Sequence, residues 1–274
     1  MIVAGLQTDI AWEDPRENFR RVDAMAEALL QGPPESAPRP HLLVLPEMFA
    51  TGFSMEAEKV AAFAPETRTF LAGLARRHSV FVLGGYGEPH RPRPANACSI
   101  FDPHGREVLH YRKLHPFSLA GEHEHYTPGD SLATTEVEGV RVTPLICYDL
   151  RFPEPFRVTA HGTDLFCVIA NWPDKRREHW SLLLRARAVE NQAYVLGVNR
   201  VGAGGGEPHS GDSALLNPLG QAVTDAPAEG AAGVLVGMVD PAMVSQVREQ
   251  FTFLKDRQPD LYRRLAEARG HQRG

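Results

Sequence analysis

The sequence predicts an α/β fold in which buried strands alternate with amphipathic helices. The chain of 274 residues is 43% hydrophobic, which suffices to bury a sizeable core. Its first half reads as strand, helix, strand, helix and strand, and its second half repeats that alternation after a bend at Cys147. No long linker divides the chain. We therefore expect a single domain over residues 1–274, with residues 254–274 as a charged C-terminal tail.

The first half begins with a β-rich stretch over residues 2–8. Asp14 and Pro15 then indicate a helix start, since aspartate is a favoured N-cap and proline is tolerated at the first helical position. Later elements follow from apolar runs, from helical spacing and from turn residues. They are a strand over 41–45, a helix over 65–78, a strand over 79–86, and a hairpin of 96–101 with 107–111.

The second half begins with a buried strand that ends at Ile146, and Pro153 then opens a helix. Cys147 therefore sits at a strand-to-helix elbow. The same criteria predict strands over 164–170 and 193–198 around a helix over 179–191, and then a strand over 233–239 and a helix over 241–253.

The glycine-rich stretch from Gly202 to Glu207 looks like a phosphate loop. However, Glu207 stands where the third glycine of a dinucleotide motif belongs, and Pro208 follows in place of a helix. We expect a mobile loop here.

Bulk properties exclude several classes of protein. A net charge of −5 with scattered basic residues offers no stripe for nucleic acid. Three cysteines disfavour a disulfide framework, and neither a cationic leader nor an apolar run of membrane-spanning length is visible. We expect a soluble cytoplasmic protein without membrane or nucleic-acid partners. His123 and His125 lack the spacing that would supply further metal ligands, so no metal site is expected.

Three reactive side chains stand near predicted strand ends. The elbow exposes the Cys147 thiol beside free backbone N–H groups, while Glu47 and Lys113 follow other strands. Each residue alone has a simpler interpretation, namely a core cysteine, a solvated or helix-capping glutamate and a surface lysine. Together they can perform nucleophilic catalysis: Glu47 accepts the thiol proton, and Lys113 with the backbone N–H of Tyr148 stabilises the oxyanion. Neither a serine elbow of the G-x-S-x-G type nor a papain-like signature is present.

The segments L-P-E-M-F, Y-R-K-L-H and C-Y-D-L-R-F-P-E, around Glu47, Lys113 and Cys147, resemble the nitrilase or carbon–nitrogen hydrolase superfamily. Later segments over 171–173, 187–194 and 217–220 also resemble that family. The resemblance implies a four-layer α-β-β-α sandwich that forms a homodimer. It also implies that Glu47 is the general base, Lys113 the oxyanion stabiliser and Cys147 the nucleophile, and that Glu122 positions the lysine and the substrate.

Tyr148 and Asp149 follow the cysteine where true nitrilases usually carry tryptophan and glutamate, which favours an amide substrate. The sequence is most similar to the ω-amidase branch, which implies release of ammonia from 2-oxoglutaramate or 2-oxosuccinamate through a thioester, without a cofactor. Amidases of deaminated glutathione or of carbamoylated amines, and a catalytically silent scaffold, stay open as alternatives.

Four residues are expected to contact the substrate: Phe117, Arg151, Asn171 and Trp172. Phe117 and Trp172 would form apolar walls. Arg151 could bind a substrate carboxylate, or it could instead brace the elbow or the dimer.

Overall fold

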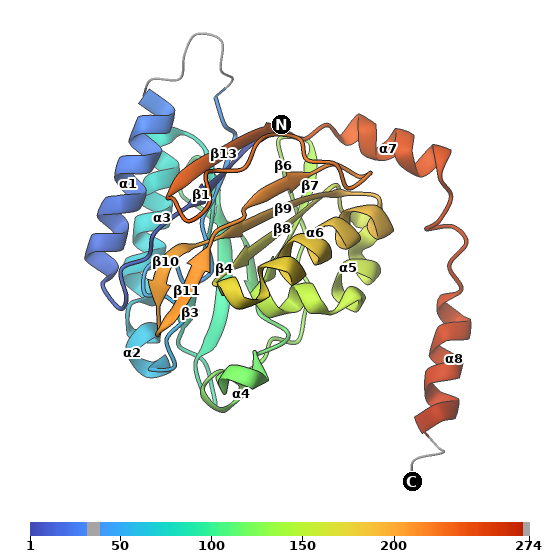
Figure 1. Ribbon diagram of the computed structural model, residues 1–274, viewed down its shortest axis with the longest axis horizontal. Helices are drawn as coiled ribbons and strands as arrows, with labels where there is room; N and C mark the ends of the chain where they lie inside the picture. The colour runs from blue at the N-terminus through green and yellow to red at the C-terminus, as the bar shows by residue number, and fades with distance from the viewer. Residues whose placement is uncertain (32–38, 271–274) are drawn as a thin grey trace.

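The computed structural model describes residues 1–31 and 39–270, so that residues 32–38 and 271–274 lie outside the description. Two sheets are stacked on each other, and helices cover the outer face of each sheet (Figure 1). This arrangement confirms the expected four-layer α-β-β-α sandwich. No helix among the described residues is long and apolar enough to cross a membrane.

The first sheet consists, in spatial order, of β13 (Gly233–Met238), β1 (Ile2–Gln7), β2 (Leu42–Val44), β3 (Phe81–Glu88), β4 (Ala95–Phe101) and β5 (Glu107–Arg112). Strands β1, β2 and β3 are parallel, and the others pair antiparallel. The parallel strands are covered on both faces, which explains their almost continuous apolar sequences.

The second sheet consists of β12 (Ala214–Leu216), β9 (Tyr194–Asn199), β8 (Leu165–Ala170), β7 (Val140–Ile146) and β6 (Thr135–Val137). Strands β7, β8 and β9 are parallel, with Ile146 beside Ile169 and Ile169 beside Val198. Their carboxyl ends therefore meet at one edge, where the residues that follow β7 and β8 lie close together.

Helices α1 (Pro15–Gln31) and α3 (Ala64–His78) pack on the first sheet, while α5 (Pro153–Thr159) and α6 (Arg177–Asn191) pack on the second (Figure 1). The remaining helical segments are α2 (Ala57–Ala62), α4 (Glu122–His125), α7 (Pro241–Gln250), α8 (Pro259–Gly270) and the short 3₁₀ turns η1 (Ser118–Ala120), η2 (Cys147–Arg151), η3 (Ala160–Gly162) and η4 (Asp174–Arg176).

The main hydrophobic core lies between the sheets and continues beneath α6. It joins buried residues of the first sheet, such as Val44 and Leu83, with Leu145 and Val168 of the second. A second cluster fills the space between the first sheet and its two helices. Burial of this apolar surface is the main favourable term for the fold.

Most predicted elements are confirmed within a few residues at each end. The Asp14 side chain accepts a hydrogen bond from the N–H of Glu17 at 3.1 Å, as expected for the cap of α1. The mobile loop predicted for residues 202–206 is wrong, because this stretch belongs to a hairpin of β10 (Val201–Gly204) and β11 (Glu207–Ser210). Within the tail, α8 was not predicted, and Figure 1 shows it standing away from the sandwich.

Candidate active site

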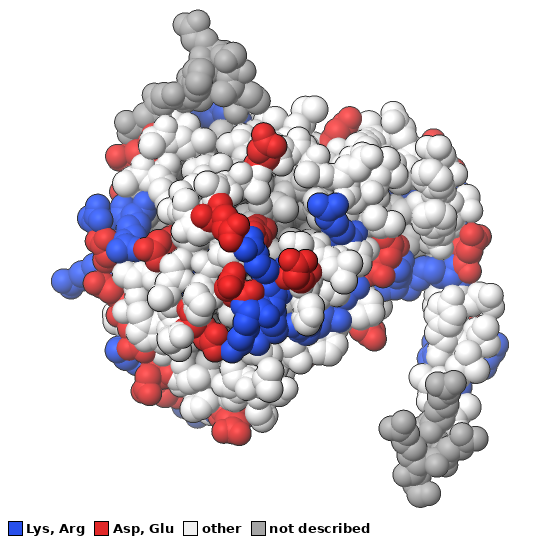
Figure 2. All heavy atoms as spheres, viewed as in Figure 1, with Lys and Arg blue, Asp and Glu red and all other residues white. Residues whose placement is uncertain are grey.

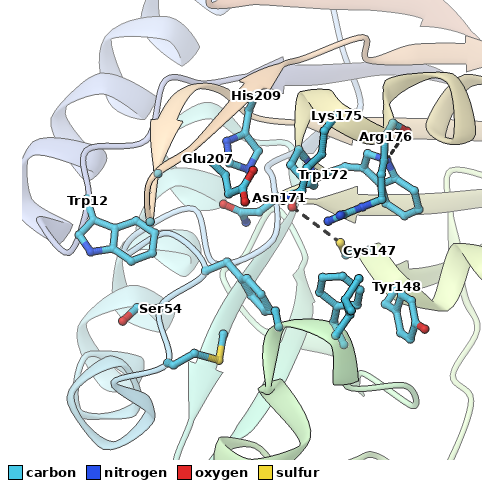
Figure 3. Close-up of a pocket in the computed structure, with 18 of the residues that line it drawn as sticks. Trp12, Ser54, Cys147, Tyr148, Asn171, Trp172, Lys175, Arg176, Glu207 and His209 are labelled. Carbon is cyan, nitrogen blue, oxygen red and sulfur yellow. Dashed lines mark hydrogen bonds and ion pairs between the residues drawn. The ribbon is translucent and has the colours of Figure 1, made fainter.

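A cavity of about 550 Å³ opens at the carboxyl ends of the central strands, which is a typical size for a small-molecule site. Residues that line it include Phe117, Cys147, Tyr148, Arg151, Asn171 and Trp172 (Figure 3). Every residue that the sequence nominated for substrate contact thus lies in the wall of this one cavity.

Cys147 stands directly after β7 and opens η2, so the predicted elbow is present. Its backbone φ is 45°, in the left-handed region that residues with a side chain rarely adopt. The thiol is 9% exposed and faces the cavity, with Sγ 4.0 Å from the carbonyl oxygen of Asn171. Cys98 and Cys167 are completely buried in the core.

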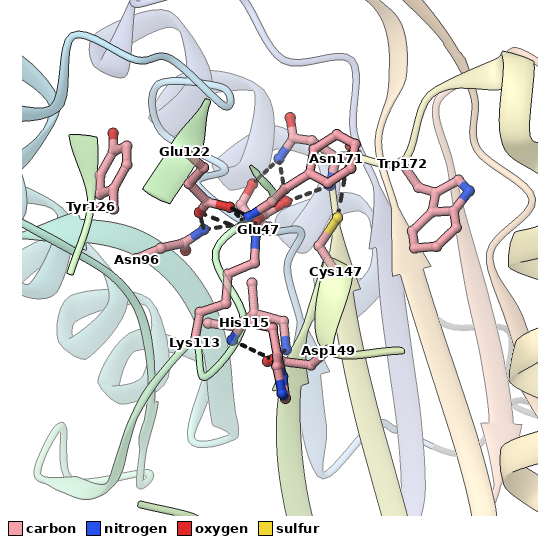
Figure 4. A network of polar contacts seen from close by, with 12 residues as sticks. Glu47, Asn96, Lys113, His115, Glu122, Tyr126, Cys147, Asp149, Asn171 and Trp172 are labelled. Carbon is pink, nitrogen blue, oxygen red and sulfur yellow. Dashed lines mark hydrogen bonds and ion pairs between the residues drawn. The ribbon is translucent and has the colours of Figure 1, made fainter. Parts of the chain in front are cut away.

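A buried ionic cluster lies beside the elbow (Figure 4). The Lys113 ammonium donates to Glu47 Oε1 at 2.9 Å and to the two oxygens of Glu122 at 3.1 and 2.8 Å. The three side chains are at most 1% exposed. A buried charge is tolerated only when it is paired in this way.

The local backbone explains how the three charged groups meet. Glu47 follows β2 and packs against Gly85 of β3, where a Cβ atom would lie 2.8 Å from the Glu47 Cα. Glycine is therefore required for the close approach of the two chain segments. Lys113 follows β5, and Glu122 opens the single turn of α4.

Asn96 in β4 belongs to this cluster, and sequence reasoning missed it. Its side-chain amide donates to Glu47 Oε1 at 2.7 Å and to Glu122 Oε1 at 2.9 Å. The backbone N–H of Lys113 donates to the carbonyl of Asn96 at 2.8 Å. The predicted hairpin brought the two segments together, but the observed register, which shifts between Ile100 and Phe101, is what places Asn96 beside Lys113.

Asn171 holds the other side of the Glu47 carboxylate. Its backbone N–H donates to Glu47 Oε2 at 2.8 Å, and its side-chain amide donates to the Glu47 carbonyl at 2.6 Å. The side-chain oxygen of Asn171 is buried without a hydrogen-bond partner among the described residues. Asn171 thus fixes the position of the carboxylate besides lining the cavity.

Asp149 connects the elbow to the segment that carries Lys113. Its fully buried carboxylate accepts from the Tyr111 hydroxyl at 2.7 Å, from the His115 N–H at 3.0 Å and from the Ile146 N–H at 3.0 Å. Tyr111 and His115 flank Lys113 along the chain, while Ile146 precedes Cys147. The sequence revealed nothing of this bridge, because its partners come from distant segments.

Burial raises the pKa of the Cys147 thiol, and the nearby charge of Glu47 raises it further, while Lys113 opposes both effects. Burial alone would lower the pKa of Lys113, but the charges of Glu122 and Glu47 outweigh burial and raise it. Lys113 is therefore an ammonium, and the resting thiol keeps its proton. The sulfur can attack only as its proton moves to a base.

The aromatic wall also holds a cation. The Arg151 guanidinium lies 4.7 Å from the centre of the Trp172 ring, and its nitrogens lie 3.4 Å from His179 Nδ1. Trp172 is fixed in turn by donation from its indole N–H to the carbonyl of Arg176 at 2.8 Å. The sequence did not single out Arg176, which also lines the cavity.

Comparison with known proteins places these features in a family. The sequence model of the carbon-nitrogen hydrolase family matches residues 2–249. The chain is 35% identical to the omega-amidase YafV of Escherichia coli over 252 residues, which are 92% of this chain and 94% of the relative. It is 30% identical to the 2-oxoglutaramate amidase of Bacillus subtilis, over 95% of this chain and 98% of that protein.

Two solved structures are also similar. The superfamily protein XC1258 from Xanthomonas campestris, which carries an arsenic adduct in its active site, has a TM-score of 0.85 at 31% identity, covering 94% of this chain and 97% of that one. A Nesterenkonia amidase with acrylamide added at its active-site cysteine has a TM-score of 0.81 at 27% identity, covering 97% and 99%.

Proposed function

This chain belongs to the carbon–nitrogen hydrolase family, and from that membership we propose that it releases ammonia from the ω-amide of a small 2-oxo acid through a thioester on Cys147. The observation that carries the proposal is that Glu47 and Lys113, which pair with each other, lie beside the thiol of Cys147, and that Cys147 lines the cavity. We propose residues 1–274 as a single carbon–nitrogen hydrolase domain, of which 254–274 form the tail.

In the proposed acylation step, Cys147 Sγ attacks the amide carbon while its proton passes to Glu47. This order follows from the raised pKa of the thiol, which leaves no preformed thiolate. The negative oxygen is held by the Lys113 ammonium and by the backbone N–H of Tyr148, which stands in the first turn of η2. Glu47 then returns the proton to the nitrogen, the carbon–nitrogen bond breaks, and ammonia leaves.

In the proposed deacylation step, Glu47 takes a proton from a water molecule, and the resulting hydroxide attacks the thioester carbon. The carbon–sulfur bond breaks, the sulfur is reprotonated and the carboxylic acid leaves. Glu122 and Asn96 hold Lys113 and Glu47 in place through both steps by their hydrogen bonds. The proposed chemistry uses side chains, the backbone N–H of Tyr148 and water.

The substrate class rests on the relatives. Several proteins that resemble this chain over more than nine-tenths of its length are named as omega-amidases or as a 2-oxoglutaramate amidase. The cavity has room for such a molecule, and its wall presents apolar rings and guanidinium groups.

Ammonia release from 2-oxoglutaramate, measured for the wild type and for Cys147→Ala, tests the proposal. We expect steady turnover by the wild type and a loss of at least ~10³-fold in the variant. Equal rates in both proteins would refute the mechanism. Turnover of deaminated glutathione or of a carbamoylated amine in place of 2-oxoglutaramate would assign the protein to that other substrate class. The absence of turnover with any amide would favour a catalytically silent scaffold.

We further propose that the protein is a cytoplasmic homodimer. The three free cysteines suit a reducing compartment. Tyr262 and Leu265 on α8 are 51% and 54% exposed, which leaves apolar surface on the tail for a second copy to cover. Sedimentation equilibrium of the full chain against a chain ending at residue 254 tests this, with a shift toward monomer expected for the shorter one.

A further inference from the structure

The Lys113 ammonium has an aromatic neighbour besides its two carboxylates. Its Nζ lies over the face of the Phe53 ring, 5.0 Å from the ring centre. Phe53 also lines the cavity, whereas the Lys113 side chain is only 1% exposed. The ring therefore borders both the cavity and the buried ammonium.

Lysines at the surface of the molecule are placed differently. Figure 2 shows Lys and Arg side chains lying beside Asp and Glu side chains at the surface. Lys175 pairs with Glu207 and Lys59 pairs with Glu13, and both lysines are more than half exposed. Water solvates such ammonium groups, so a neighbouring ring would add little. The Lys113 ammonium is out of reach of solvent, where the attraction of a ring face is largest.

The segment that carries Phe53 is fixed by the same helical turn that carries Glu122. The Tyr126 hydroxyl donates to the Ser54 carbonyl at 2.7 Å, and the Tyr126 N–H donates to the Glu122 carbonyl at 2.8 Å. Tyr126 is completely buried beside the ionic cluster (Figure 4). The position of the Phe53 backbone is thus tied to that of Glu122.

An aromatic face suits this position for two physical reasons. Its negative quadrupole attracts a cation, yet it accepts no conventional hydrogen bond, so the N–H groups of the ammonium stay available for carboxylates or for an oxyanion. The ring is also apolar, which keeps the local dielectric low and the field of the ammonium strong. A polar side chain at the same place would compete with the oxyanion for the N–H donors.

We propose that Phe53 is a positioning residue, which holds the Lys113 ammonium through its ring face and shields the ionic cluster from water in the cavity. This role rests on the proposed amidase function, in which Lys113 stabilises the oxyanion, and it adds a residue that acts through Lys113. The rate of the reaction then depends on the electron density of the ring and not on its shape alone.

Fluorination of the ring separates this attraction from packing, because it weakens the quadrupole while the ring keeps nearly the same size. Phe53 is replaced in turn by mono-, di- and trifluorophenylalanine, and ammonia release from 2-oxoglutaramate is measured. We expect kcat to fall stepwise along the series, by ~3- to 30-fold in total, with KM within ~3-fold of wild type. A change in KM alone, or a kcat that is the same across the series, would overturn the proposal.

Phe101 is the matched control. It is buried and lies at the opposite end of β4 from Asn96, where the Arg68 guanidinium is 6.0 Å from the centre of its ring. The same fluorinated residues at position 101 should leave kcat within ~2-fold of wild type, because this ring faces a cation that lies outside the ionic cluster. An equal fall at both positions would show a general effect of fluorination and overturn the role of Phe53.

Urea unfolding tests the contact without any substrate and so separates this proposal from the amidase proposal. Trifluorination at position 53 should lower the folding equilibrium constant ~3- to 30-fold in the wild-type background. In Lys113→Met/Glu122→Gln, which has no ammonium for the ring to attract, the effect should be at most ~2-fold. Equal losses in the two backgrounds overturn the proposal.

The two measurements also cover the cases in which one of them fails. If the wild type hydrolyses no amide but the losses of stability differ, the amidase proposal fails and the contact between ring and ammonium stands. If the double variant does not fold, the kcat series at position 53 against that at position 101 decides.

Discussion

The buried ionic cluster beside Cys147, called the floor below, and the rim of the cavity differ in how their charges are satisfied. The floor, which consists of Glu47, Asn96, Lys113 and Glu122, is buried and closed on itself by hydrogen bonds. At the rim, Arg151 and Arg176 are half-buried and contact aromatic rings. The floor is thus organised before any ligand arrives, whereas the rim keeps donors available for one. Catalytic power and substrate choice can therefore be altered separately.

The largest effect is expected when the cation of the floor, the Lys113 ammonium, is removed. We expect Lys113→Met to lower kcat/KM by at least ~10³-fold, because the oxyanion loses its ammonium. The unfolding free energy should also fall by about 3–5 kcal/mol, since two buried carboxylates are left without a cation. Ammonia release and urea unfolding measure the two effects.

A second substitution separates these two losses. The double variant Lys113→Met/Glu122→Gln has one buried carboxylate fewer, so it should recover part of the stability and none of the activity. If the single variant unfolds like the wild type, the floor is not held by its charges.

Asp149 tests whether the floor must be aligned with the elbow. We expect Asp149→Asn to lower kcat by ~10- to 100-fold with KM within ~3-fold, since a small displacement of reacting groups is costly while the rim is untouched. Steady-state kinetics with 2-oxoglutaramate give both values.

Asp164→Asn is the control for Asp149. Asp164 is also a buried carboxylate, but it pairs with Arg141 at the opposite end of β8 from Asn171. Both variants should lose about 1–3 kcal/mol of stability, and only Asp149→Asn should lose kcat. Equal kcat values in the two variants would remove the alignment role.

The rate of alkylation by iodoacetamide measures how accessible the Cys147 thiol is and how readily it ionises beside the floor. Cys147 should react well before Cys98 and Cys167, because it alone among the three faces the cavity. Because the charge of Glu47 is one cause of the raised thiol pKa, Glu47→Gln should lower that pKa and speed the reaction several-fold at neutral pH, and the rates of the two proteins should converge as the pH rises above the thiol pKa. Peptide mapping by mass spectrometry identifies the labelled site. Modification of Cys167 first would place the reactive centre elsewhere.

The smallest effect is expected at the boundary between floor and rim. Tyr148 is proposed to act through its backbone N–H, and its hydroxyl has no hydrogen-bond partner among the residues that the structure describes. Tyr148→Phe should therefore keep kcat/KM within ~2-fold of wild type. A tenfold loss would show that the hydroxyl takes part in binding or in proton transfer.

The sequence by itself determined the α/β order of the chain, the elbow at Cys147 and the positions of Glu47 and Lys113 at strand ends. These features depend on short-range signals, namely apolar periodicity, helix caps and the abrupt change from an apolar run to polar residues. The glycine-rich stretch from 202 to 206 was misjudged because its pairing with β11 is a tertiary outcome that composition does not encode.

Only the tertiary structure decided which groups hydrogen-bond to the reactive side chains or pair with their charges. The Glu47 carboxylate is held by Asn96, 49 residues away, and by Asn171, 124 residues away, and Asp149 bridges to segments 34 and 38 residues distant. The protonation of the Cys147 thiol and the absence of a carboxylate partner for Arg176 in the described residues are likewise set by burial and by distant neighbours. Hydrogen bonding and charge depend on distance in space, which a linear sequence does not record.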